Sequence, residues 1–161
     1  MSISDTVHNY LSEKNIPYET ITHQSSKSSV QSAIAAQIPL HQMAKAVILK
    51  DNRDQYLMAI LPAANRVNIH QLNQITNSKL QFATEHELNR RFNDCEPGAI
   101  PPFGAPYRMN VLWDNRLSNN SNTYLEAGDH ETLICLMQES LLKISGDQPH
   151  NDLCSAPPRN H

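Results

Sequence analysis

The sequence contains few of the residues that mark several large protein classes. Of its 161 residues, only four are glycine, three are cysteine and 6% are aromatic. The low glycine content excludes a collagen repeat, and the lack of any Cys-x-x-Cys pair argues against a disulfide framework or a cysteine zinc site. Three cysteines far apart in the chain suit a reducing compartment, so we expect a cytoplasmic protein.

Long apolar runs and an excess of positive charge are also missing. No stretch approaches the ~20 apolar residues of a membrane span, and the first residues have no signal-peptide pattern. The formal net charge is −3, whereas proteins that coat nucleic acid carry clustered Lys and Arg. We therefore expect no membrane and no DNA as partners, and only a small or assisted contact with any RNA.

Familiar catalytic motifs are absent as well. The chain has no Gly-x-Gly-x-x-Gly, no Walker loop and no Gly-x-Ser-x-Gly elbow. His86 begins a pattern like the His-Glu-x-x-His zinc helix, but Arg90 occupies the place of the second histidine and cannot bind a metal. The remaining histidines are not paired at ligand spacing, so we expect neither a metal nor a cofactor.

The apolar patterns predict one mixed α/β (α+β) domain. Helical spacing predicts helices over residues 4–15, 30–38, 69–75 and 85–92, and a strand followed by a helix over 132–144. Strands are predicted over residues 18–23, 44–50, 56–61, 80–84, 109–113 and 123–127. Hairpins at 44–61 and 109–127 would exclude an all-parallel sheet. We expect residues 1–145 to form the domain and residues 146–161, which are nearly devoid of apolar side chains, to be a disordered tail.

Lys45 occupies an unusual place, one position into an apolar strand. By two-residue alternation it shares a face with Val47 and Leu49. Two interpretations remain open. In the first, the aliphatic stem of Lys45 covers apolar surface while its ammonium reaches water at the end of the strand. In the second, the ammonium belongs to a functional site. Lys50, on the opposite face beside a turn, is more simply explained as a solvated charge.

The loop over residues 96–107 holds four of the ten prolines and two of the four glycines. A rigid surface connection with no role beyond geometry is one explanation. However, Gly98 and Gly104 in this loop and Gly128 in a later one leave the backbone open to close approach by a ligand. In a chain with so little glycine, this clustering indicates a binding surface.

The order of these features resembles the YbaK-like family of aminoacyl-tRNA deacylases, which includes the editing insertion of bacterial prolyl-tRNA synthetases. The resemblance covers residues 3–145, with an early strand that ends in His23. It rests on the strand Met43-Ala44-Lys45-Ala46-Val47-Ile48-Leu49, the loop Pro97-Gly98-Ala99-Ile100-Pro101-Pro102-Phe103-Gly104 and the segment Tyr124-Leu125-Glu126-Ala127-Gly128. It implies a single mixed α/β domain in which helices surround a curved, barrel-like sheet.

The resemblance also implies a function. It implies a trans-editing hydrolase that cleaves the ester of a mischarged tRNA carrying a small amino acid, with tRNA for proline as one substrate, and so supports translation fidelity. Lys45 is the implied catalytic residue. The implied substrate-binding residues are His23, Gly98, Ala99, Ile100, Pro101, Pro102, Ala127 and Gly128. The implied partner is the acceptor end of aminoacyl-tRNA, delivered by a synthetase or an elongation factor.

Two alternatives remain open. Ala99 and Ala127 stand where many relatives carry glycine, and their methyl groups would narrow a pocket. This departure supports a non-catalytic module of the same fold that senses or binds aminoacyl-tRNA or an amino acid. A protein-interaction domain that uses Ile100 and Phe103 is the third hypothesis.

The chemistry of an aminoacyl ester makes few demands on the protein. The ester is reactive enough for water to attack it without a Ser or Cys nucleophile and without a metal. As an ammonium, Lys45 would hold the terminal phosphate or ribose and stabilise charge on the carbonyl oxygen, and one such donor is typically worth ~3 kcal/mol. General-base action would instead require a strongly lowered pKa.

Overall fold

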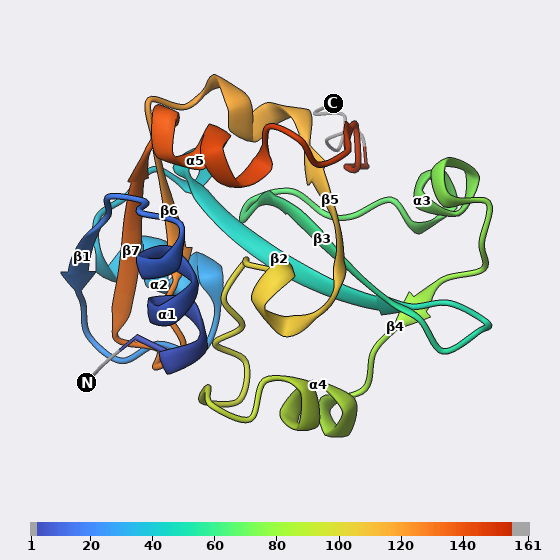
Figure 1. The fold of residues 1–161 in the computed structure, drawn as a ribbon, viewed down its shortest axis with the longest axis horizontal. Helices are drawn as coiled ribbons and strands as arrows, with labels where there is room; N and C mark the ends of the chain where they lie inside the picture. The colour runs from blue at the N-terminus through green and yellow to red at the C-terminus, as the bar shows by residue number, and fades with distance from the viewer. Residues whose placement is uncertain (1–2, 156–161) are drawn as a thin grey trace, which may run out of the picture.

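The computed structural model describes residues 3–155, which form one mixed sheet with helices on both faces (Figure 1). The strands run in the order β1-β7-β6-β2-β3-β5-β8, and β4 pairs with β2. The strands are β1 (Glu19–Thr22), β2 (Met43–Lys50), β3 (Tyr56–Pro62), β4 (Gln81–Phe82), β5 (Asn110–Asp114), β6 (Asn122–Glu126), β7 (Thr132–Met137) and β8 (His150–Asn151). The helices are α1 (Asp5–Glu13), α2 (Ser29–Ala35), α3 (Ile69–Thr76), α4 (Glu85–Arg91) and α5 (Gln138–Ser145). The predicted mixed α/β fold is confirmed, and among the described residues the sheet is curved but open rather than closed into a barrel.

Each face of the sheet buries its own set of apolar side chains. On one face, Val7 of α1 and Leu141 of α5 share a core with Ala44 and Ile48 of β2. The opposite face has two smaller clusters, one under α2 and one under α3. In Figure 1, α1 lies in front of β6 and β7, whereas α3 lies toward the turn end of the β2–β3 pair.

The predicted hairpin at residues 44–61 is confirmed. β2 and β3 pair antiparallel from Ala44 opposite Pro62 to Lys50 opposite Tyr56. In the turn, Asp51 Oδ1 accepts hydrogen bonds from the backbone N–H groups of Arg53 and Gln55 at 2.8 and 2.9 Å. These bonds stabilise the turn and so fix the register that places Lys45 in the sheet.

The second predicted hairpin, at residues 109–127, is wrong. β5 pairs in parallel with β3 and β8, whereas β6 pairs in parallel with β2 and antiparallel with β7. A 3-10 helix, Asn115–Asn119, carries the chain between them. Alternation in the sequence identifies both strands, but it does not identify the strands with which they pair.

The prediction that residues 146–161 form a disordered tail is wrong for residues 146–155. Strand β8 pairs with β5, and Leu153 is fully buried with Leu49 and Leu72. Cys154 is also buried, and its backbone forms an isolated antiparallel β-bridge with Val67. Residues 146–155 therefore belong to the fold, docked by the buried Leu153 and Cys154 and by backbone pairing. The rest of the predicted tail, residues 156–161, lies outside the described residues.

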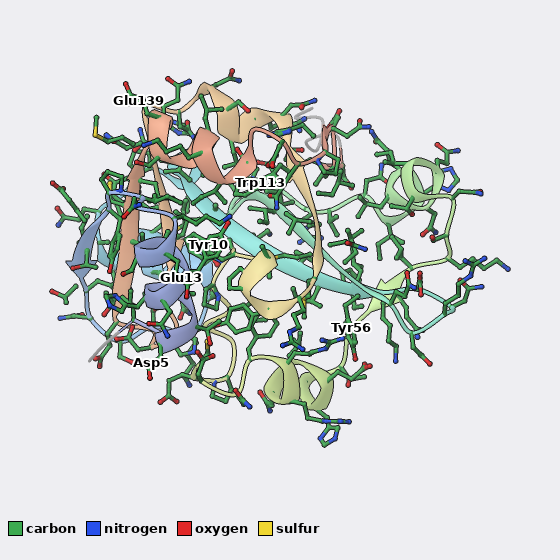
Figure 2. All side chains as sticks on the ribbon, viewed as in Figure 1. Asp5, Tyr10, Glu13, Tyr56, Trp113 and Glu139 are labelled. Atoms are coloured by element: carbon green, nitrogen blue, oxygen red, sulfur yellow. The ribbon has the colours of Figure 1, made fainter. Side chains whose placement is uncertain are left out.

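Lys50 is not the solvated charge expected from its place beside a turn. Its Nζ lies 2.6 Å from Glu87 Oε2 on α4 and 3.7 Å from Asp54. The Tyr56 hydroxyl donates to the same Glu87 oxygen at 2.7 Å, and Figure 2 shows Tyr56 beside α4. The hydrogen bond from Lys50, with those from Thr84 and Tyr56, lowers the pKa of Glu87 to about 2. This network attaches α4 to the hairpin.

No helix within residues 3–155 has the length and apolar character needed to cross a membrane.

Candidate functional site

Lys45 lies between the two apolar clusters on one face of the sheet. Odd-numbered residues of β2 share this face. Met43 packs with Ala33 of α2 at one end, and Leu49 packs with Leu72 of α3 at the other. Lys45 is half-buried between them and forms no ion pair with any residue of the 3–155 segment.

The surroundings of Lys45 lower its pKa below the usual value of 10.5. Burial is the main cause, because it removes water from the ammonium. The Cys154 thiol opposes this effect, and the positive charge of Arg66 adds to it. A partly desolvated ammonium without a carboxylate partner favours an anionic ligand.

The structure brings the Gly98 loop and the Gly128 turn together. Gly98 and Gly128 both have positive φ angles, +85° and +118°. The Glu96 N–H donates a hydrogen bond to the Gly128 carbonyl at 2.7 Å, and the His130 ring bonds to the Pro97 carbonyl. Gly98 is exposed, so its backbone is accessible at the surface of this double loop.

The other predicted binding residues of these loops face inward. Ala99 and Ala127 are fully buried, Pro101 and Pro102 are buried, and Ile100 packs half-buried against the main core. The methyl groups of the two alanines therefore contact the interior, which does not support the expected narrowing of a pocket. The Ala127 carbonyl also accepts a 2.8 Å hydrogen bond from the Ser4 N–H, so this turn is tied to the start of α1.

A buried polar cluster beside the Gly98 loop was not predicted from the sequence. Glu126 is only 2% exposed, and its Oε1 accepts a hydrogen bond from the Ser32 hydroxyl of α2. Its second oxygen, His23 Nε2 and His130 Nδ1 are buried, and none has a hydrogen-bond partner within the described chain. Burial raises the pKa of Glu126, while the bond from Ser32 and the two histidines oppose the rise.

His23, a predicted binding residue, therefore lies with Glu126 and His130. Its Nδ1 is 2.6 Å from the Gln24 carbonyl, and its backbone N–H donates to the Glu131 carbonyl at 2.8 Å. The signal that could have revealed the cluster is Glu126 itself, a single acidic residue in an otherwise uncharged strand.

The cleft on the Gly128 side is strongly acidic. It has a volume of about 720 Å³, and its acidic lining residues are Asp5, Asp94, Glu96, Asp129 and Glu131. These carboxylates would repel phosphate groups, so a nucleic acid would approach from another side. Within the part of the chain that the structure describes, no group of three His, Cys, Asp or Glu side chains is arranged to hold a metal ion.

Fold and site together define a class of mixed α/β domain. Its central strand carries a lysine that forms no ion pair within the described residues, and two glycine-containing loops adjoin each other. A model of the aminoacyl-tRNA editing domain matches residues 23–144. This span contains Lys45, the Gly98 loop and the Gly128 turn. The chain therefore belongs to the aminoacyl-tRNA editing domain family, and the predicted family is confirmed.

Solved structures share this fold at low sequence identity. A hypothetical protein superposes with a TM-score of 0.83 at 16% identity, covering 94% of this chain and 100% of that one. A protein proposed as a trans-editing enzyme for prolyl-tRNA synthetase superposes with a TM-score of 0.81 at 17% identity, covering 95% of this chain and 97% of that one. A protein from Marinobacter aquaeolei VT8 proposed to act in signal transduction superposes with a TM-score of 0.75 at 16% identity, covering 94% of this chain but 30% of that one. A search of curated proteins found no match.

Proposed function

We propose that this protein is a trans-editing aminoacyl-tRNA deacylase, which hydrolyses the ester between tRNA and a wrong small amino acid. The observation that carries the proposal is Lys45, a half-buried ammonium that lies on the central strand of an editing-domain fold and has no carboxylate partner among residues 3–155. Its position suits a substrate that is anionic beside the reacting ester.

The reaction balances with water as the only co-reactant. Water oxygen attacks the ester carbonyl carbon, and negative charge develops on the carbonyl oxygen. The bond to the terminal ribose oxygen then breaks, the ribose oxygen takes the proton released by water, and free amino acid and tRNA result. Lys45 stabilises the developing charge or holds the adjacent phosphate, and the exposed backbone at Gly98 orients the ester.

The electrostatics support a substrate that is held by its end alone. The protein is net acidic and its Gly128 cleft is lined by carboxylates, so contact with many phosphates is unfavourable. Binding of the acceptor end alone is weak, which favours delivery by a synthetase or an elongation factor. The fold neighbour proposed as a trans-editing enzyme for prolyl-tRNA synthetase makes mischarged tRNA for proline the first substrate to test.

A non-catalytic binding module is the second candidate. The fold recurs as less than a third of a protein proposed to act in signal transduction, a setting in which sensing is the expected role. A sensor would bind aminoacyl-tRNA or an amino acid without cleaving the ester.

A deacylation screen separates the two candidates. We would charge tRNA with alanine, cysteine, serine, threonine and proline, and follow ester loss at a protein concentration far below that of the substrate. The enzyme releases many equivalents of at least one small amino acid. A sensor leaves the ester intact or protects it, and that outcome across the whole panel would contradict the proposal.

A further inference from the structure

The turn that follows β3 brings a second cation to the neighbourhood of Lys45. Lys45 pairs with Leu61 across the β2–β3 ladder, and the chain then turns, with the Asn65 N–H donating to the Pro62 carbonyl at 3.0 Å. Arg66 follows directly. It is exposed and lies three residues beyond Ala63, whose N–H donates to the Met43 carbonyl at 2.7 Å, so backbone pairing holds this turn beside the strand that carries Lys45. Its positive charge also lowers the pKa of Lys45.

The C-terminal segment anchors the backbone at Arg66. The Ser155 N–H donates to the Arg66 carbonyl at 2.8 Å, and Val67 forms a bridge with Cys154. The next residue, Asn68, donates its N–H to the Leu153 carbonyl at 2.7 Å. Arg66 is therefore presented by a fixed backbone rather than by a free loop, which reduces the entropy lost when its side chain binds.

Neither cation is neutralised within the described part of the chain. Asp114 and Asp152, which accept hydrogen bonds from the backbone of Leu153 and Cys154, are already engaged, since Arg116 lies 3.0 Å from Asp114 and 2.8 Å from Asp152. Neither Arg66 nor Lys45 forms an ion pair with any residue between positions 3 and 155. Two neighbouring like charges repel, and an anion that contacts both removes that repulsion.

We propose that Arg66 and Lys45 form a phosphate-binding site, in which Arg66 holds a backbone phosphate at the 3′ end of tRNA. The inference rests on the proposed function, because it places the phosphate next to the aminoacylated ribose that Lys45 serves. The guanidinium fork suits two phosphate oxygens at once, whereas an ammonium acts as a point charge. Arg66 is thus a positioning residue for the nucleic-acid end of the substrate.

Binding of uncharged RNA tests the site independently of any hydrolysis. The probe is an RNA hairpin that ends in unpaired CCA, followed by fluorescence anisotropy over a range of salt concentrations. Arg66→Ala weakens binding roughly ten-fold. It also makes the slope of the logarithm of the binding constant against the logarithm of the salt concentration shallower by about one. Arg53→Ala is the matched control, another exposed arginine, in the β2–β3 turn at the other end of the hairpin. Equal affinity of the two variants, or a parent protein that does not bind the hairpin, would overturn the proposal.

Hydrolysis of two substrates, with and without a phosphate, tests the phosphate role of Arg66 separately from the proposed deacylase activity. On the aminoacylated hairpin, Arg66→Ala raises KM roughly ten-fold with little change in kcat. On aminoacyl-adenosine, which has no phosphate, Arg66→Ala has the same KM and kcat as the parent. Equal losses on both substrates would overturn the phosphate role. If the parent binds the hairpin through Arg66 but hydrolyses neither substrate, the deacylase proposal fails and the phosphate site stands.

Discussion

At the scale of single residues, Lys45 and Lys50 show how surroundings decide the use of a charge. Both lie on β2, but Lys50 is bound at 2.6 Å to Glu87, whereas Lys45 is half-buried among apolar side chains. The Lys50 charge is neutralised within the fold. The Lys45 charge is partly desolvated and has no ion-pair partner within residues 3–155, which is why we assign the chemistry to it.

The backbone at Gly98 gives a prediction about stability. Its φ of +85° is one that residues with a side chain rarely adopt, although an added Cβ would lie 3.5 Å from the His130 ring, an ordinary contact. Gly98→Ala should therefore cost about 1–2 kcal/mol from backbone strain alone. Thermal unfolding measures this loss. Gly98→Asn is the control, because Asn tolerates positive φ and should lose less, and an Ala variant as stable as the parent would refute the strain.

This strain changes how the loop can be tested. The positive φ makes a stability loss part of any substitution at Gly98, so activity must be compared between variants of equal folded fraction.

At the scale of elements, the C-terminal segment has the largest effect on how the site is built. It adds β8 to the sheet, buries Leu153 and fixes the backbone of Arg66. Composition alone predicts disorder here because the segment is polar and proline-rich. Its docking depends on a few side chains, chiefly Leu153 and Cys154, and on hydrogen bonds to residues distant in the chain, which local sequence does not reveal.

Leu153 gives the corresponding prediction. Leu153→Ala should lower the free energy of unfolding by about 3 kcal/mol, because it empties a fully buried position. Truncation after Ser145 should cost more, since it also removes the pairing of β8. Urea denaturation measures both. Met137→Ala is the control because Met137 is 66% exposed and should change little, and equal stability of the two alanine variants would show that the segment is not docked.

At the scale of the whole molecule, sequence and structure differ in what each can specify. Local periodicity predicts most of the helices, the β2–β3 hairpin and the face that carries Lys45. It does not predict the strand order, in which β6 lies beside β2 and β5 beside β3. The cluster of His23, Glu126 and His130 escapes prediction for the same reason, because it forms between residues about a hundred positions apart only after the sheet assembles.

Stability of the whole domain should fall at low pH, where Asp94 and Glu87 both become protonated. Burial alone would raise the pKa of Asp94, but hydrogen bonds from Ser4, Thr6 and Tyr107 outweigh it and lower the pKa to about 2, below the ordinary 3.8. A lowered carboxyl pKa means that the stabilisation is present above pH 3.8 and is lost as the pH falls through about 2.

Asp94→Asn should therefore cost about 1 kcal/mol at pH 7 and flatten the loss of stability between about pH 4 and pH 2. Urea denaturation at a series of pH values follows the effect. Asp147→Asn, at an exposed position without a hydrogen bond to its carboxylate in the described structure, is the control. Parallel pH profiles for the parent and Asp94→Asn would contradict the assignment.

The most direct test of the account is deacylation by Lys45→Ala, measured on a mischarged tRNA that the parent hydrolyses. Removing the one ammonium beside the ester should reduce kcat by roughly 100-fold, the usual cost of losing a charge-stabilising donor. The variant should still unfold cooperatively, because Lys45 forms no ion pair within residues 3–155. Lys79→Ala is the control, because Lys79 is an exposed lysine outside β2. A Lys45→Ala protein as active as the parent and the Lys79 control would contradict the central claim.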